Sequence, residues 1–277
     1  DMNKNWFFMA LLVFCFAIPS SYGKDCNIFV HGYTSDGKDY FGDLPRQVIW
    51  DSNQKVELAA PELAEKITEK MGSCDPDSRV VIRAHSYGVA VTHYILGKGR
   101  QFQDLHPNHP FVFLYKSVSS VYSYTGAFHG TPLMDLVCSG GVTRYVGRLI
   151  GKKCVRTLTT SRVGNVSSMI RSSGVPTHLI YSTDDSGHGG IMGKFISKHF
   201  VSWWDYLFKG VRNQNDNTLP IYSTRGCAEK KLMPQEDSNC EKLDSNFFID
   251  FYHTQSQHHT EFVKDEAFML MKNHRAN

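Results

Sequence analysis

The string AHSYG at residues 84–88 has the residue types of a serine nucleophile held in a tight turn. An apolar run that predicts a strand, residues 79–83, precedes it, and a run that predicts a helix, residues 89–96, follows it. Such a turn requires small residues two positions before and after the serine, and alanine and glycine stand there. The turn would place Ser86 at a helix N-terminus, where backbone N–H groups stabilise developing negative charge. We therefore predict that Ser86 is a nucleophile for acyl transfer.

A second string, His31-Gly32-Tyr33, directly follows the apolar run at residues 26–30, which predicts another buried strand. If the two strands are neighbours, Tyr33 lies beside Ser86. The backbone N–H groups of Tyr33 and Tyr87 would then form an oxyanion hole for the tetrahedral intermediate. We interpret His31 as a structural histidine that hydrogen-bonds its loop, and a chemical role is the alternative.

A serine nucleophile needs a base, and the base needs an acid that holds its tautomer. In the fold to which such a turn belongs, both follow the serine, first the acid and then a histidine. The C-terminal candidates for the base are His253, His258 and His259. We favour His259, because residues 265–271 predict a last helix, and the loop that enters this helix is where the fold presents its histidine.

Two regions supply candidates for the acid. Asp216 stands in a turn-rich loop, NQNDNTLP, ahead of an apolar run. Asp184 and Asp185 directly follow the run THLIYS at residues 177–182, which predicts a strand. The position at a strand end favours this pair, and a solvated loop aspartate is the ordinary alternative for each candidate.

Several strings together resemble the bacterial triacylglycerol lipases and related esterases of the α/β-hydrolase superfamily. They are FVHGY at residues 29–33, AHSYG at 84–88, TGAFHGTPLMD at 125–135, NDNTLP at 215–220 and HTEFVKD at 259–265. They occur in the family's order, although Phe128 replaces a proline and Asn217 a glycine of the family's strings. The resemblance implies an α/β-hydrolase fold, ester hydrolysis, and a triad of Ser86, Asp216 and His259. We interpret His129, in the third string, as a structural hydrogen-bonding residue.

Expected strands and helices alternate along the chain, which favours a mostly parallel sheet flanked by helices. Strands are expected at residues 26–30, 79–83 and 177–182, within 111–124 and more weakly at 219–223, and helices at 61–71 and at 89–96. Pro61 would start the first helix, and Gly72 and Gly97 would end the two helices.

Two insertions interrupt this pattern. Residues 133–174 are predicted to lie over the sheet as a small lid or cap. Residues 195–211 contain an aromatic cluster at 203–208 (WWDYLF). Core packing is one interpretation of this cluster, and an acyl-chain pocket or lipid-interface surface is the other.

The first 23 residues predict a signal peptide, because Lys4 precedes an apolar run that ends in proline and small residues. We expect residues 24–277 to form the mature α/β-hydrolase domain, either secreted or in the periplasm. Six cysteines remain after cleavage, and an even number in an exported protein favours disulfides. The simplest pairing joins cysteines that are near in sequence: Cys26 with Cys74, Cys138 with Cys154, and Cys227 with Cys240.

The composition of the 277-residue chain limits its partners. With 30 basic and 27 acidic residues and no long run of Lys and Arg, nucleic acid is not an expected partner. No cofactor or metal is expected, since the sequence has no C-x-x-C string and the His258-His259 pair lacks helical ligand spacing. The expected substrate is a lipid or small ester, with transient contact to a lipid interface. Two alternatives stay open: a phospholipase or other acyl hydrolase with the same triad, or an inactive α/β-hydrolase that binds a lipid or a protein.

Overall fold

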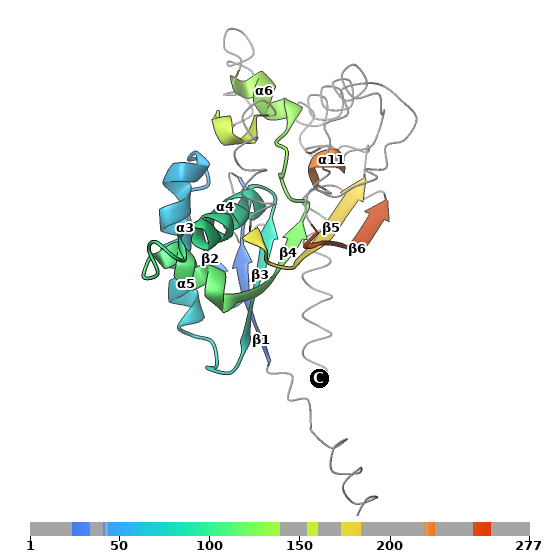
Figure 1. The fold of residues 1–277 in the computed structure, drawn as a ribbon. Helices are drawn as coiled ribbons and strands as arrows, with labels where there is room; N and C mark the ends of the chain where they lie inside the picture. Colours follow the sequence, from blue (N-terminus) through green and yellow to red (C-terminus); the bar gives the residue numbers. More distant parts are fainter. Residues whose placement is uncertain are drawn as a thin grey trace, which may run out of the picture.

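The structure, a computed structural model, describes residues 24–33, 41, 44–138, 154–159, 173–183, 219, 221–224 and 246–255. In this part of the chain, six strands form one sheet in the order β2-β1-β3-β4-β5-β6 (Figure 1). They are β1 (Asp25–Val30), β2 (Gln47–Val48), β3 (Arg79–His85), β4 (Val118–Tyr124), β5 (Thr177–Thr183) and β6 (Phe248–Gln255). Every neighbouring pair is parallel, so all six carboxyl ends meet at one edge of the sheet. The prediction of a mostly parallel sheet is confirmed.

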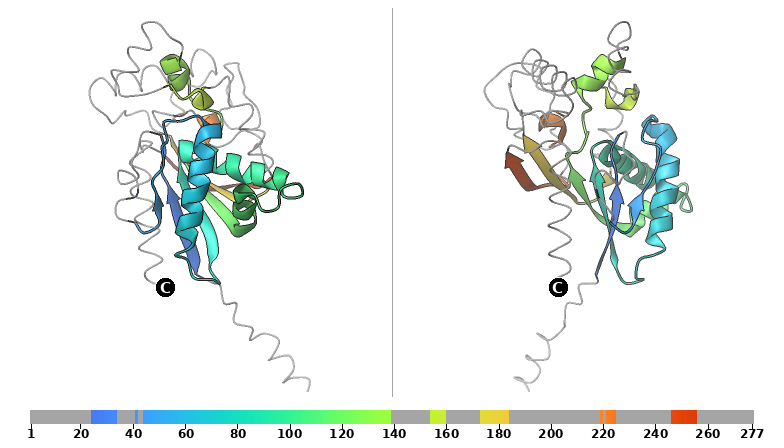
Figure 2. Two further views of the ribbon diagram at one scale, coloured as in Figure 1. Left: turned by 90° about the vertical axis from the view of Figure 1, so that its left-hand side faces the viewer. Right: turned by 180° about the vertical axis from the view of Figure 1, so that it is seen from behind.

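Three helices cover one face of this sheet (Figure 2). They are α3 (Val56–Met71), α4 (Tyr87–Phe102) and α5 (Pro110–Ser117). Alternate strand residues, among them Ile28, Ile82 and Val121, face these helices and form the main buried core. The other face carries a smaller buried cluster around Phe29 and Tyr124. The apolar runs in the strands therefore bury this face of the sheet under the three helices.

Short elements lie beyond the carboxyl ends of the strands (Figure 1). These are α6 (Pro132–Cys138), the 3-10 helix η1 (Arg156–Leu158) and α11 (Ile221–Thr224). The N–H of Thr131 donates to the carbonyl of Leu158 at 2.9 Å, which joins the start of α6 to η1. α6 and η1 belong to the insertion predicted at residues 133–174. Most of this insertion, and all of residues 195–211, lie outside the described residues.

Several predicted strands need correction. Residues 219–223, expected as a weak strand, contain α11 instead, because a run as short as LPIY does not distinguish strand from helix. The interval 111–124 begins with α5, and only its second half is β4. The α5 start has helix signals: Pro110 in the first turn, and the His109 ring, whose Nδ1 accepts from the Phe111 N–H at 3.1 Å. β2 and β6 were not expected, since β2 has two residues and polar residues interrupt β6 (FIDFYHTQ).

The helix boundaries also differ from the prediction. α3 begins at Val56, before Pro61, because its buried stripe already includes Val56, Ala59 and Ala60. It ends before Gly72, as predicted. α4 continues past Gly97 to Phe102. A Cβ at Gly99 would overlap the carbonyl of Phe111, so glycine in this helix allows close contact with α5 and does not end the helix.

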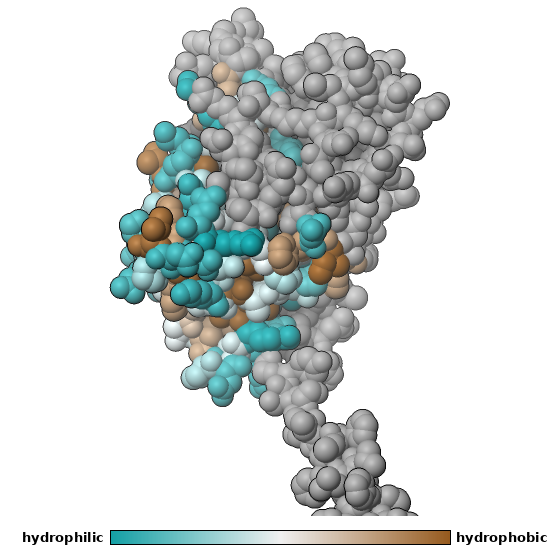
Figure 3. Space-filling view, viewed as in Figure 1, coloured by the Kyte–Doolittle hydropathy of each residue, from teal (hydrophilic) through white to brown (hydrophobic). Residues whose placement is uncertain are grey.

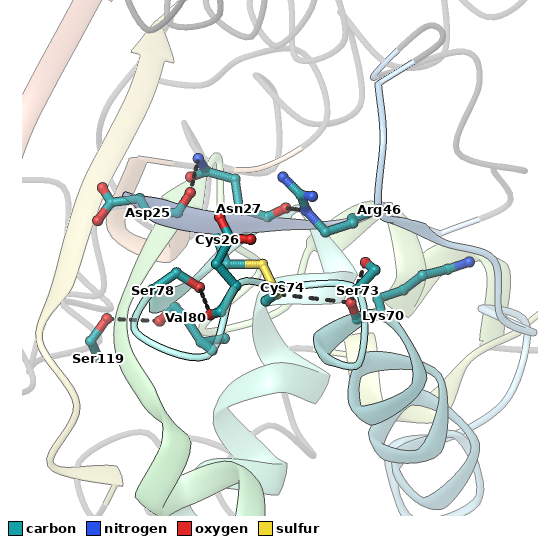
Figure 4. The surroundings of a disulfide bond; sticks show 11 residues. Asp25, Cys26, Asn27, Arg46, Lys70, Ser73, Cys74, Ser78, Val80 and Ser119 are labelled. Atoms are coloured by element: carbon teal, nitrogen blue, oxygen red, sulfur yellow. Dashed lines mark hydrogen bonds between the residues drawn. A yellow bond between two sulfur atoms is a disulfide. The ribbon is translucent and has the colours of Figure 1, made fainter. Parts of the chain in front are cut away.

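Two of the three predicted disulfides fall within the described residues, and both are formed. Cys26–Cys74 joins β1 to the turn after α3, with Cα atoms 5.7 Å apart (Figure 4). Beside it, Arg46 Nε donates to the carbonyl of Asn27 at 3.1 Å. Cys138–Cys154 joins the end of α6 to the segment before η1, with Cα atoms 5.0 Å apart. Cys227 and Cys240 lie outside the described residues.

The described surface exposes several large apolar side chains. Leu105 and Phe113 lie on or near α5, and Ile249 and Phe251 lie on β6. In the space-filling view, brown areas are interspersed with teal ones (Figure 3). The aromatic cluster at 203–208 lies outside the described residues, so its two interpretations stay predictions. None of the described helices is long and apolar enough to cross a membrane.

Candidate active site

Ser86 occupies the junction between β3 and α4 in a backbone conformation that ordinary residues avoid. β3 ends at His85 and α4 begins at Tyr87, so Ser86 is the N-cap residue of the helix. Its φ is 52° and its ψ is −119°, a combination rarely adopted by residues with a Cβ. The residue is 8% exposed. The predicted sharp strand-to-helix turn, here called the serine turn (residues 84–88), is therefore present.

Two glycines allow neighbouring backbone to approach this turn. A Cβ at Gly88 would lie 2.5 Å from the carbonyl oxygen of His31, and a Cβ at Gly32 would lie 2.8 Å from the Cβ of Ser86. Neither position leaves room for a side chain. The requirement for a small residue at position 88 thus has a steric cause. The contact at Gly32 also places this glycine directly against Ser86, just beyond the end of the parallel pairing of β1 with β3.

His31 is buried and hydrogen-bonded through both ring nitrogens. Its Nδ1 lies 2.8 Å from the carbonyl oxygen of Gly32, and the N–H of Trp50 donates to its Nε2 at 3.4 Å. Because a carbonyl only accepts, the proton resides on Nδ1 and the ring is neutral. The ring also stacks on the indole of Trp50, with centroids 5.5 Å apart. These contacts support the structural interpretation of His31.

Tyr33 and Tyr87 are predicted to form an oxyanion hole through their backbone N–H groups; Tyr87 directly follows Ser86, and Tyr33 directly follows Gly32, which lies close to Ser86. Tyr87 is the first residue of α4, and the first N–H groups of a helix lack partners within the helix. Its hydroxyl donates to the carbonyl of Gln54 at 2.8 Å, and burial raises the pKa of Tyr87 well above its usual value. Tyr33 is buried in the main core. Both side chains are thus structural, and the oxyanion hole stays a prediction about backbone groups.

The end of β4 hydrogen-bonds the backbone of Ser86 on both sides. The Ser86 N–H donates to the carbonyl of Tyr124 at 3.0 Å, and the Ala127 N–H donates to the carbonyl of Ser86 at 3.1 Å. Between them, the Thr125 N–H donates to the carbonyl of Ile180 in β5 at 2.8 Å. The two-residue segment Thr125–Gly126, here called the β4 turn, therefore connects the serine turn to β5. Thr125 and Gly126 belong to one of the strings that resemble the family, but no role was predicted for them from the sequence.

His129 lies next along this loop and is buried. Its backbone N–H donates to the Ser223 hydroxyl of α11 at 3.0 Å. Leu219, shortly before α11, is buried in the main core. This backbone hydrogen bond joins the loop after β4 to α11, and the structural interpretation of the His129 side chain stays a prediction. Leu219 and Ser223 follow Asp216 by three and seven residues, and Asp216 itself lies outside the described residues.

The structure leaves the rest of the predicted triad untested. Asp184 and Asp185 directly follow β5, and His258 and His259 follow β6 by three and four residues, all outside the described residues. His253 belongs to β6, where it pairs with Tyr181 in the ladder, so it occupies a strand position and not a loop. β5 and β6 end at the same edge of the sheet as the serine turn. Among the described residues, no group of three or more His, Cys, Asp or Glu side chains could hold a metal ion.

Comparison with solved structures identifies the fold. The chain matches the mature form of Bacillus licheniformis lipase BlEst2 with a TM-score of 0.58 and 14% sequence identity, over 93% of this chain and 94% of that one. It matches the propeptide form of that lipase with a TM-score of 0.57 and 14% identity, over 90% of this chain and 49% of that one. The metagenomic carboxyl esterase MGS0156 matches with a TM-score of 0.51 and 14% identity, over 87% of this chain and 65% of that one. The chain thus has the α/β-hydrolase fold, as the resemblance implied. No family model and no curated protein matches the sequence.

Proposed function

We propose that the protein is an exported carboxylic ester hydrolase acting on acylglycerols or other lipid esters, with Ser86, His259 and Asp216 as its triad. The observation that carries the proposal is the backbone of Ser86, which has a positive φ at the N-terminus of α4 and hydrogen bonds on its N–H and its carbonyl. Strained conformations of this kind cluster at active sites, because the surrounding structure must hold the side chain toward reactants. The lipase and the carboxyl esterase that share the fold support an ester as the substrate class.

In the proposed reaction, His259 takes the proton of the Ser86 hydroxyl while that oxygen attacks the ester carbonyl carbon. The carbonyl oxygen becomes an oxyanion, which the backbone N–H groups of Tyr33 and Tyr87 stabilise. The imidazolium then gives its proton to the leaving alcohol, and an acyl-serine remains. Water, deprotonated by the same histidine, releases the carboxylic acid and restores Ser86. Asp216 orients the imidazole and stabilises its charged form.

The described structure supports Asp216 as the acid. Leu219 is buried in the main core, and Ser223 accepts a hydrogen bond from the loop after β4. Leu219 and Ser223, three and seven residues after Asp216, are therefore held near the loop that contacts Ser86. Asp184, directly after β5, is the alternative acid. The variants Asp216→Asn and Asp184→Asn should be compared. We expect replacement of the triad acid, Asp216, to lower kcat by about four orders of magnitude, and Asp184→Asn to leave kcat near the wild-type value.

A fluorophosphonate probe tests the proposal, because only an activated serine reacts with it quickly. Purified mature protein would be labelled, digested, and the adduct mapped. We expect the label on Ser86, and we expect His259→Ala to abolish labelling while His253→Ala leaves it intact. Ser123→Ala is a matched control, since Ser123 is a fully buried serine of β4 outside the serine turn.

The outcomes separate the alternatives. Label on Ser86 that depends on His259 establishes the enzyme class, and a panel of acylglycerol, phospholipid and short-chain esters then identifies the substrate. Label at another serine would move the active site. A folded sample that takes no label, as judged by circular dichroism, would favour an inactive α/β-hydrolase that binds a lipid or a protein.

Export is part of the proposal and has its own support. The disulfides Cys26–Cys74 and Cys138–Cys154 fit an oxidising compartment. We expect the mature chain to begin at Lys24, after cleavage of a signal peptide comprising residues 1–23. N-terminal sequencing of the protein recovered from a host that exports it would test this. An unprocessed N-terminus on correctly folded, disulfide-bonded protein would contradict it.

A further inference from the structure

Thr125 combines backbone strain with complete burial at a position that the proposed triad does not use. Its φ is 43°, within the left-handed region, and it is fully buried. A β-branched residue in this region is an outlier, whereas glycine would adopt the same backbone without strain. The Thr125 hydroxyl has no hydrogen-bond partner in the described structure. The side chain's own hydrogen bonding therefore does not explain why threonine stands here.

The hydrogen bonds of the surrounding backbone do explain the strained conformation. Tyr124 accepts from the N–H of Ser86, and Ala127 donates to the carbonyl of Ser86, so the chain must change direction within the two residues between them. Gly126 cannot carry a side chain, because a Cβ there would lie 2.5 Å from the Ser123 hydroxyl oxygen. Of the two residues, Thr125 is the one that adopts a positive φ, and both hydrogen bonds form around it.

The β4 turn is also fixed to the neighbouring strand. The N–H of Thr125 donates to the carbonyl of Ile180 at 2.8 Å, in the strand that leads to the candidate acids. Three backbone hydrogen bonds thus hold Thr125 and the two peptide groups of Ser86 in one rigid arrangement. A β-branched side chain narrows the φ and ψ range of such a turn, while glycine would widen it.

We infer that Thr125 is a positioning residue for Ser86: its strained turn is hydrogen-bonded to β5 and places Tyr124 and Ala127 where they bind the two peptide groups of the nucleophile. This inference rests on the proposed function. A fixed serine backbone keeps the hydroxyl oxygen at the distance and angle required for attack, and small displacements of a reacting group cost large factors in rate. Both the strain and the unpartnered hydroxyl are unfavourable for stability, so stability does not account for threonine at this position.

The test compares mature wild type with Thr125→Gly, using kcat and KM on a soluble short-chain ester and the rate constant of fluorophosphonate labelling at Ser86. We expect Thr125→Gly to lower kcat and the labelling rate about tenfold. KM should change less than twofold, and Tm should stay the same or rise because the strain is relieved. Thr125→Val, which keeps β-branching and loses only the unpartnered hydroxyl, should restore most of the lost rate. If Thr125 had only a structural role, its substitution would change Tm without lowering kcat and the labelling rate together.

Arg46→Gly is the matched control for relief of strain. Arg46 also has a positive φ, 61°, but its carbonyl accepts from Phe29 and it makes no hydrogen bond to the serine turn in the described structure. We expect kcat of this variant to match wild type. If Thr125→Gly does not fold, Thr125→Asn replaces it, since asparagine tolerates the left-handed region and is not β-branched.

Two results would overturn the inference. If wild type is labelled at Ser86 and Thr125→Gly is labelled equally fast, the inference fails while the proposed function stands. If folded wild type takes no label, the proposed function fails and this inference fails with it. An equal loss of kcat in Arg46→Gly would also contradict it, because the effect would then follow from any relief of strain.

Discussion

Helix α4 carries two buried polar sites, and they are organised in opposite ways. At its N-terminus, Ser86 is held with a φ of 52°, next to a second strained residue, Thr125. Seven residues later, His93 lies in the core within regular helix and has partners on both ring nitrogens. The first site holds the proposed nucleophile in an unfavourable backbone conformation, whereas the polar atoms of the second have hydrogen-bond partners. Backbone strain is thus found at the candidate catalytic residue, and hydrogen-bonded polar atoms are found at the structural residue.

The hydrogen bonds of His93 define a neutral ring. The Thr177 hydroxyl donates to the carbonyl of Val175 at 3.0 Å, so it accepts from the Nε2–H of His93, 3.4 Å away. The Ser173 hydroxyl then donates to Nδ1, also at 3.4 Å. Phe128 contacts the ring edge-to-face, with centroids 5.6 Å apart. Burial lowers the pKa of His93 to about 3, so the folded protein keeps this ring uncharged.

The largest expected effect comes from removing the hydroxyl at the strained end. Ser86→Ala should lower kcat for ester hydrolysis by about 10⁶-fold, because the nucleophile and the covalent intermediate are lost together. The free energy of unfolding should stay within about 0.5 kcal/mol of wild type, since a single small side chain is trimmed. Turnover assays and urea unfolding on the same preparation would check both statements. If Ser86→Ala retained esterase activity, Ser86 would not be the nucleophile.

The second effect concerns the steric requirement of the serine turn. A Cβ at Gly88 would lie 2.5 Å from the carbonyl oxygen of His31, so Gly88→Ala must push two backbone segments apart. We expect a loss of about 3 kcal/mol in the free energy of unfolding. Gly72→Ala is the matched control: Gly72 has an ordinary φ of −61°, and its nearest new contact would be 3.2 Å, so we expect a change of at most about 1 kcal/mol. Equal losses in a urea titration would contradict the steric account of the turn.

The third effect is a pH dependence at the satisfied site. Below about pH 6.5 the unfolded chain binds a proton at His93 that the folded chain does not bind, because burial lowers its pKa to about 3. Stability is therefore lost as pH falls from about 6.5 toward 3, by as much as about 1.4 kcal/mol per pH unit. Between pH 6.5 and 5 the loss attributable to His93 should be about 2 kcal/mol.

Urea unfolding of wild type and His93→Gln at both pH values would measure this contribution, since glutamine does not titrate. His178→Gln is the comparison variant. Burial and the nearby Arg83 also lower the pKa of His178, but its partial exposure should make its contribution smaller. If His93→Gln lost as much stability on acidification as wild type, the neutral ring would not be a feature of the folded state.

The two sites also differ in how far the sequence predicted them. The turn at Ser86 could be predicted because small residues flank a serine between two apolar runs, and β1, β3, β5 and the first two disulfides followed from similar local patterns. The role of His93 could not be predicted from the sequence, because its hydrogen-bond partners Ser173 and Thr177 are some 80 residues away and no sequence spacing relates them to it. β6 was missed because polar residues interrupt it. Gly97 does not end its helix, because α4 continues to Phe102 and packs closely against α5 at Gly99.

The smallest expected effect lies between the two sites. Thr92, one residue before His93, is 1% exposed, and its hydroxyl has no hydrogen-bond partner in the described structure. Thr92→Val removes this unsatisfied group without changing shape, so it should stabilise the fold by about 1 kcal/mol and leave kcat unchanged. Thr177→Val removes a hydroxyl that accepts from His93, so it should destabilise the fold by about 1–3 kcal/mol. Urea unfolding would measure both free energies. If Thr92→Val and Thr177→Val changed the free energy of unfolding in the same direction, the presence of a hydrogen-bond partner would not explain the effect of these hydroxyl groups on stability.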